Sequence, residues 1–104
     1  MKNITNDMIS SGIKKFINTY AQIEKMGESD GHKETCLKLI REVYPNYDFH
    51  TMSTTLIVLQ RKGMIEGLNI ENGCVVEPIK PRLTDKARKE IETRKVAFES
   101  GEMG

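Results

Sequence analysis

The hydrophobic pattern of this 104-residue chain changes its period at Gly63, and that change constrains the fold more than any other feature. Upstream of Gly63, apolar residues recur every three or four positions over residues 49–59, which indicates the buried face of a helix. Downstream, residues 64–70 and 74–79 form strand-like runs around Asn72-Gly73, a dipeptide that favours a tight hairpin turn. A helix that leads directly into a β-hairpin predicts an α+β fold.

Helix start and stop signals complete the predicted order of elements. A long first helix ends at Gly27, which can adopt a left-handed conformation, and a second covers residues 36–43. Pro45 stops the second helix because proline lacks the backbone donor, and Asp48 can cap the third. A last helix begins at residue 84 or 85. The apolar positions that define the first and last helices are Ile9, Ile13, Phe16, Ile17, Tyr20 and Ile23, and Leu83, Ala87, Ile91 and Phe98.

The size and composition are those of one small globular domain. We expect a single domain over residues 1–99 and a flexible tail of small residues over 100–104. No apolar run approaches the roughly 20 residues that span a bilayer, and the N-terminus lacks the apolar centre of a signal peptide. Cys36 and Cys74 lie in apolar runs, which predicts two reduced, buried thiols and a cytoplasmic protein.

Two short motifs flank the predicted hairpin and resemble a known superfamily. Residues 59–66 read Leu-Gln-Arg-Lys-Gly-Met-Ile-Glu, and residues 83–87 read Leu-Thr-Asp-Lys-Ala. Both resemble the core of winged-helix regulators such as the MarR and PadR families, and the later part is similar to the small bacterial winged-helix proteins of the YjcQ family. The resemblance implies a winged helix-turn-helix fold with three helices, a two-stranded β-hairpin wing and a C-terminal helix. It also implies that the helix over residues 48–63 is a recognition helix that enters the major groove of double-stranded DNA.

Polar side chains of the predicted recognition helix are candidates for DNA contact. Four of them can donate to phosphate or base acceptors, and Arg61 can pair with phosphate or guanine. The net charge is only +1, so a basic surface must be local. Residues 31–62 hold five basic and three acidic side chains, against two and three in residues 63–83. The candidates on the helix are His50, Thr51, Ser53, Thr54 and Arg61, and the further candidates for phosphate contact are Lys33, Lys38, Arg41, Lys62, Lys80 and Arg82.

Other features of the same segment favour a protein partner. A helical projection at about 100° per residue places Ile57 and Val58 away from the buried stripe, where a helix that reads DNA is normally polar. Exposed apolar groups on one helix are typical of self-association, and a two-fold dimer is the commonest soluble oligomer. The predicted hairpin tip carries Glu71, which phosphate would repel. These patterns predict a homodimer through Ile57 and Val58 or contact with another protein.

Three functions therefore remain open at this stage. The first is a DNA-binding transcriptional regulator that acts as a homodimer. The second is a non-catalytic protein-interaction module, or a phage or mobile-element accessory protein, built on the same fold. The third is a DNA-partition adaptor.

Sequence motifs for catalysis are missing. The chain has no phosphate-binding glycine motif, no paired-cysteine zinc motif and no His-Glu-x-x-His. Two histidines and two cysteines could in principle meet around a metal ion, but their spacing is irregular. We therefore expect neither enzyme activity, nor a cofactor, nor a metal site.

Overall fold

A computed structural model describes the backbone of residues 6–99 and the side chains of residue 12 and residues 14–94. It has an α+β architecture, as the sequence predicts. The predicted tail over residues 100–104, and the side chains of Ile9, Ile13 and Phe98, lie outside the described part. The elements are α1 (Asn6–Glu28), α2 (Lys33–Arg41), α3 (Phe49–Arg61), β1 (Ile65–Glu66), β2 (Asn69–Glu71), β3 (Cys74–Val76), β4 (Arg82–Leu83) and α4 (Asp85–Glu99).

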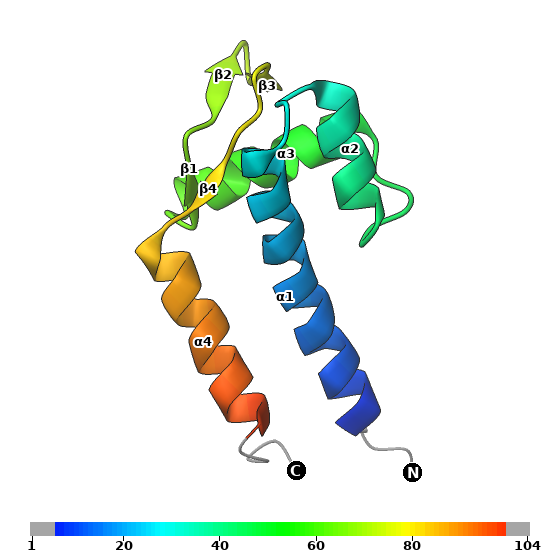
Figure 1. Cartoon of the computed structure of the whole chain (residues 1–104), viewed down its shortest axis with the longest axis vertical. Coiled ribbons are helices and arrows are strands. Elements are labelled where there is room, and N and C mark those ends of the chain that lie inside the picture. The colour runs from blue at the N-terminus through cyan, green and yellow to red at the C-terminus, as the bar shows by residue number, and fades with distance from the viewer. Residues whose placement is uncertain (1–5, 100–104) are drawn as a thin grey trace.

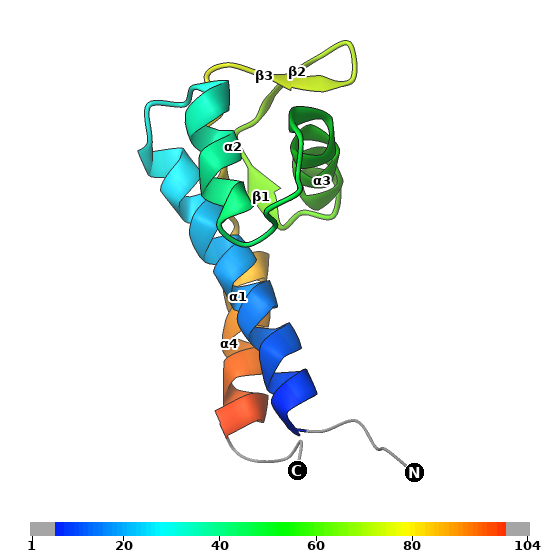
Figure 2. The same cartoon turned by 90° about the vertical axis from the view of Figure 1, so that its right-hand side faces the viewer.

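The molecule consists of a head and a two-helix stalk. The short helices α2 and α3 and the four strands form the head, while α1 and α4 run side by side away from it (Figures 1 and 2). Both stalk helices have their free ends at the same end of the molecule (Figure 1). The overall extents of 47 × 29 × 22 Å reflect this elongated arrangement. None of the helices, within the residues described, is long and apolar enough to cross a membrane.

The β-hairpin is interrupted in the middle. At its tip β2 pairs with β3, and Asn72 and Gly73 have φ values of 52° and 77°, which confirms the predicted tight turn. At its base β1 pairs with β4. Two residues separate the paired segments in the first arm, residues 67–68, and five separate them in the second, residues 77–81. The strand-like run predicted over residues 64–70 is therefore broken into β1 and β2. The strand β4 was not predicted, because it forms after Pro78 and Pro81 only by pairing with the distant β1.

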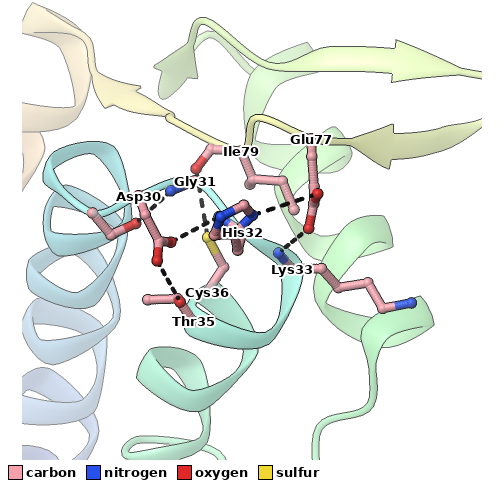
Figure 3. Close-up of polar contacts among 9 residues, drawn as sticks. Asp30, Gly31, His32, Lys33, Thr35, Cys36, Glu77 and Ile79 are labelled. Atoms are coloured by element: carbon pink, nitrogen blue, oxygen red, sulfur yellow. Dashed lines mark hydrogen bonds and ion pairs between the residues drawn. The ribbon is translucent and has the colours of Figure 1, made fainter.

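The second arm of the hairpin bulges towards the loop between α1 and α2. Ile79 in this bulge is fully buried, and its N–H donates to the carbonyl oxygen of Gly31 at 2.8 Å. The thiol of Cys36 lies 3.5 Å from the Ile79 carbonyl oxygen, to which it donates (Figure 3). The bulge thus attaches the hairpin to the start of α2.

One cluster of buried side chains connects the four helices with the hairpin. Its members from α1 and α2 pack against the inner faces of α3, the strands and α4. The buried apolar residues are Tyr20, Ile23, Met26, Cys36, Ile40, Met52, Leu56, Ile57, Met64, Ile65, Val75, Ile79, Leu83 and Ala87.

Gly27 does not end the first helix, which continues to Glu28. A Cβ atom at this position would overlap the carbonyl oxygen of Pro81. Gly27 is therefore explained by the close approach of the second hairpin arm to α1, and not by a left-handed helix end. The second helix ends at Arg41, before Pro45, the residue that was predicted to stop it.

The two cysteines are unpaired, as predicted, but only one of them is buried. Cys36 lies in the core, and burial raises the pKa of its thiol. Cys74 is exposed, so the prediction of a buried thiol was wrong at this position. Side chains alternate along a strand, and Val75 takes the inward position of β3, which turns Cys74 outward.

Candidate nucleic-acid interface

Both ends of α3 are fixed by side chains. At the start, the Asp48 carboxylate accepts the N–H of Thr51 at 2.8 Å, which confirms the predicted cap and lowers the pKa of Asp48. At the other end, the ammonium of Lys86 from α4 donates to the carbonyl oxygen of Lys62 at 2.9 Å. Gly63 follows with a φ of 78°, a left-handed conformation that favours glycine. The first contact satisfies a backbone N–H at the start of α3, and the second joins the end of α3 to α4.

The outward face of α3 is polar and contains no carboxylate. His50, Thr51, Thr54 and Arg61 are all exposed on it, together with Val58. Among the four helices in the described part of the chain, α3 is the one whose sequence contains neither aspartate nor glutamate. A polyanion on this face therefore meets no carboxylate from the residues of the helix, although the capping carboxylate of Asp48 lies at its start beside Thr51.

Two residues of α3 that were predicted to make contacts, Ser53 with DNA and Ile57 with a partner, are buried instead. Ser53 is only 2% exposed, and its Oγ accepts the N–H of Val75 at 2.8 Å. Ile57, one turn further along the same flank, is 9% exposed and belongs to the core. The hairpin strand β3 packs against this side of α3. A projection of the isolated helix shows this side as exposed, because it does not include β3. The predicted apolar patch is thus reduced to Val58, which is 41% exposed.

The three cations predicted on α2 are exposed, and two of them have defined positions. The ammonium of Lys33 lies over the ring of Phe49, 4.6 Å from its centroid. The Nε of Arg41 donates to the carbonyl oxygen of Tyr47 at 2.7 Å, beside the turn between α2 and α3. Lys38 is exposed on the same helix. Positive charge is therefore available next to the start of α3.

The hairpin offers much less positive charge than the helices. Arg82 at its base lies 3.7 Å from the Glu66 carboxylate of the paired strand. Glu71 is exposed at the tip, and Lys80 is exposed in the bulge. An exposed ion pair of this kind is weak, but it leaves Arg82 with less net charge to offer a phosphate.

The start of α2 is capped by two carboxylates, one from the preceding loop and one from the distant hairpin bulge (Figure 3). Glu77 in the hairpin bulge accepts the N–H of Lys33 at 2.6 Å, and its other oxygen lies 3.6 Å from Nδ1 of His32. Asp30 accepts the N–H of His32 at 2.9 Å and the hydroxyl of Thr35 at 3.2 Å. These backbone hydrogen bonds are the largest cause of the lowered pKa of both carboxyls.

Sequence reasoning did not identify Glu77, because no local pattern links it to a helix that begins 44 positions earlier. The neighbouring acidic and histidine side chains do not form a metal site. In the part of the chain that the structure describes, no group of three or more His, Cys, Asp or Glu side chains is arranged to hold a metal ion.

Comparisons of the chain with protein-family models, with curated proteins and with solved structures gave no match. Function is therefore inferred from the chain's own sequence and geometry.

Proposed function

We propose that this chain is a small winged-helix DNA-binding protein, a transcriptional regulator that works in the cytoplasm as a homodimer. In this proposal α3 is the recognition helix, the β2–β3 hairpin is the wing, and binding without catalysis or a cofactor is the mechanism. The observation that carries the proposal is the carboxylate-free outward face of α3, which presents His50, Thr51, Thr54 and Arg61.

The arrangement of the head supports this assignment. A helix of 13 residues is about 20 Å long and, with its side chains, fits the major groove, which is about 12 Å wide. α2 precedes α3 across a short turn and carries Lys33, Lys38 and Arg41, which can contact phosphates while α3 contacts base edges. Arg61 at the far end of α3 can pair with guanine or with a phosphate.

The wing has a small part in the proposed contact. Glu71 at its tip and the Glu66–Arg82 pair at its base leave it without a net positive surface. Its main task is structural, since β3 covers the flank of α3 and fixes that helix through Ser53. DNA contact is therefore expected to centre on α2 and α3.

The stalk is the proposed dimer interface in place of Ile57, which is buried. α1 and α4 extend beyond the head (Figure 2), and Phe16, Ile17 and Ile91 on them are only partly buried. A second copy could cover this apolar surface in a two-fold dimer. Sedimentation at micromolar concentration should give the mass of two chains, and a monomer alone would contradict the dimer.

The DNA proposal is tested by fluorescence anisotropy with labelled double-stranded genomic fragments over a range of salt concentrations. Arg61→Ala should weaken binding and reduce the salt slope by about one, because one phosphate contact is lost. Lys14→Ala, which removes an exposed charge from α1 outside the head, is the matched control and should bind like the wild type. The proposal fails if no fragment binds at low salt, or if the two variants weaken binding equally.

A DNA-partition adaptor stays the third candidate. The second candidate is a protein-interaction module, or an accessory protein of a phage or mobile element. It is favoured by Val58 and Ile70, large apolar side chains that are 41% and 40% exposed on α3 and β2. Val58→Ser separates the candidates, because it removes the apolar side chain without adding a carboxylate to this face of α3. It should reduce DNA affinity only modestly if α3 contacts phosphates mainly through Arg61, but it should abolish a complex in which Val58 enters an apolar pocket of another protein.

A further inference from the structure

The strand β2 has an open edge. Within the residues that the structure describes, its sheet consists of two strands, β2 and β3, and β3 is the arm that packs on α3. All three residues of β2, Asn69–Glu71, are exposed. Proline is one of the residues that block a strand edge, but Pro78 and Pro81 lie in the other arm of the hairpin. The edge of β2 is therefore available to a further strand.

The backbone of Ile70 points to this edge. The Val75 N–H donates to the Oγ of Ser53 at 2.8 Å, so it is directed away from β2. Residues directly opposite each other in an antiparallel pair exchange either both backbone hydrogen bonds or none. Ile70 lies opposite Val75, and it therefore directs both its N–H and its carbonyl oxygen outward. Among the described residues, no backbone group of a turn or loop takes up either of them.

The sequence of β2 is complementary to a second copy of itself. In an antiparallel pair with its two-fold axis at Ile70, the two Ile70 residues exchange both hydrogen bonds, and each Asn69 lies opposite the Glu71 of the other strand. The Asn69 amide can donate to that carboxylate, and the two carboxylates are not directly opposite. Ile70 is 40% exposed, and the second Ile70 would cover part of it.

This contact is too small to hold two copies together alone. A stable protein interface buries at least roughly 1,000 Å², which a strand of three residues does not supply. The pairing needs another attachment that keeps two copies close, because a high effective concentration then replaces free diffusion. The hairpin and the free ends of the stalk lie at opposite ends of the molecule (Figure 1), so one chain can use both surfaces at once.

We propose that the edge of β2 pairs with the edge of β2 in a second copy of this chain, and that copies bound side by side on DNA use this contact to bind cooperatively. A second copy is favoured over another protein because the strand is complementary to itself. The use on DNA rests on the proposed function, whereas the edge pairing does not.

Cysteine cross-linking tests the edge pairing without DNA. Ile70→Cys in a Cys74→Ser chain places a thiol at the two-fold axis, where the Cα atoms of a hydrogen-bonded pair are about 5.5 Å apart, a separation that a disulfide spans. At millimolar protein concentration and with a mild oxidant, a disulfide-linked dimer should accumulate. The matched control is Val58→Cys in the same background, which places the thiol at an equally exposed apolar position and should stay without this link. Equal cross-linking of the two chains overturns the pairing.

The use on DNA is tested with labelled double-stranded genomic fragments and with a duplex too short for neighbouring sites. Ile70→Pro removes the outward N–H, and it leaves the bonds between β2 and β3 in place because Ile70 makes none of them. It should bind the short duplex like the wild type, but on long fragments the second copy should bind about tenfold more weakly, which corresponds to about 1.4 kcal/mol. Circular dichroism checks that the variant is folded.

The outcomes separate the two parts of the proposal. Equal cooperativity of Ile70→Pro and wild type on long fragments overturns the use on DNA. Cross-linking through position 70 in a chain that binds no DNA refutes the proposed function and leaves the edge pairing standing.

Discussion

Ser53→Ala tests whether the hairpin is attached to α3 as the structure shows. The substitution removes the Oγ that accepts the Val75 N–H, and both residues are almost completely buried. A buried donor without a partner costs about 1–3 kcal/mol. In a domain of this size each 1 kcal/mol shifts the melting temperature by about 4–8 °C, so a loss of about 2 kcal/mol lowers it by about 8–16 °C.

The matched control is Thr54→Ala, which removes a hydroxyl from the exposed neighbour. It should change the free energy of unfolding by no more than about 0.5 kcal/mol. Urea denaturation followed by far-UV circular dichroism measures both variants. At a temperature where both are folded, DNA affinity should fall for Thr54→Ala and stay unchanged for Ser53→Ala. The reasoning is refuted if the two variants are equally stable, or if Ser53→Ala loses more DNA affinity than Thr54→Ala.

Three further perturbations examine other contacts of the head and stalk. Gly27→Ala should destabilise the fold by about 1–3 kcal/mol in thermal melts, because the new methyl overlaps the second hairpin arm. The control Gly12→Ala has open space on α1 and should stabilise the helix by up to about 1 kcal/mol. The pKa of the Glu77 carboxyl is lowered in the folded state, so its contribution to stability is present at neutral pH and is lost as the pH falls below about 4. Glu77→Gln should therefore melt lower than wild type at pH 7 and lose less stability between pH 7 and pH 3. A thiol reagent should modify Cys74 in the native protein and Cys36 only after denaturation. In an absorbance assay, one thiol should therefore react fast and the other slowly. Two fast thiols would contradict the buried position of Cys36.

Local signals in the sequence predicted the features that depend on neighbouring residues. The cap at Asp48, the end of α3 near Gly63 and the turn at Asn72-Gly73 were all predicted correctly. Each depends on a backbone conformation or a hydrogen bond within a few positions of the chain. The exposed position of His50, Thr54 and Arg61 followed from helical periodicity in the same way.

Contacts between distant segments were not predictable from these signals. The contact of Lys86 with the end of α3 was not identified, since its position beside Lys62 depends on how α4 leaves the hairpin. The same holds for the pairing of β1 with β4, which joins residues 65–66 to residues 82–83.

The sequence by itself determined the order of the four helices, the position of the hairpin turn and the polar outward face of α3. Only the tertiary structure decided how much of that face is exposed, because β3 packs against one flank of α3 and buries Ser53 and Ile57 there. A helical projection treats α3 as alone in water, and it therefore placed Ile57 on the outside. Ser53 was a candidate DNA contact only because its hydroxyl can donate a hydrogen bond. Burial is set by whatever segment packs against a helix, and here that segment follows α3 and folds back over it.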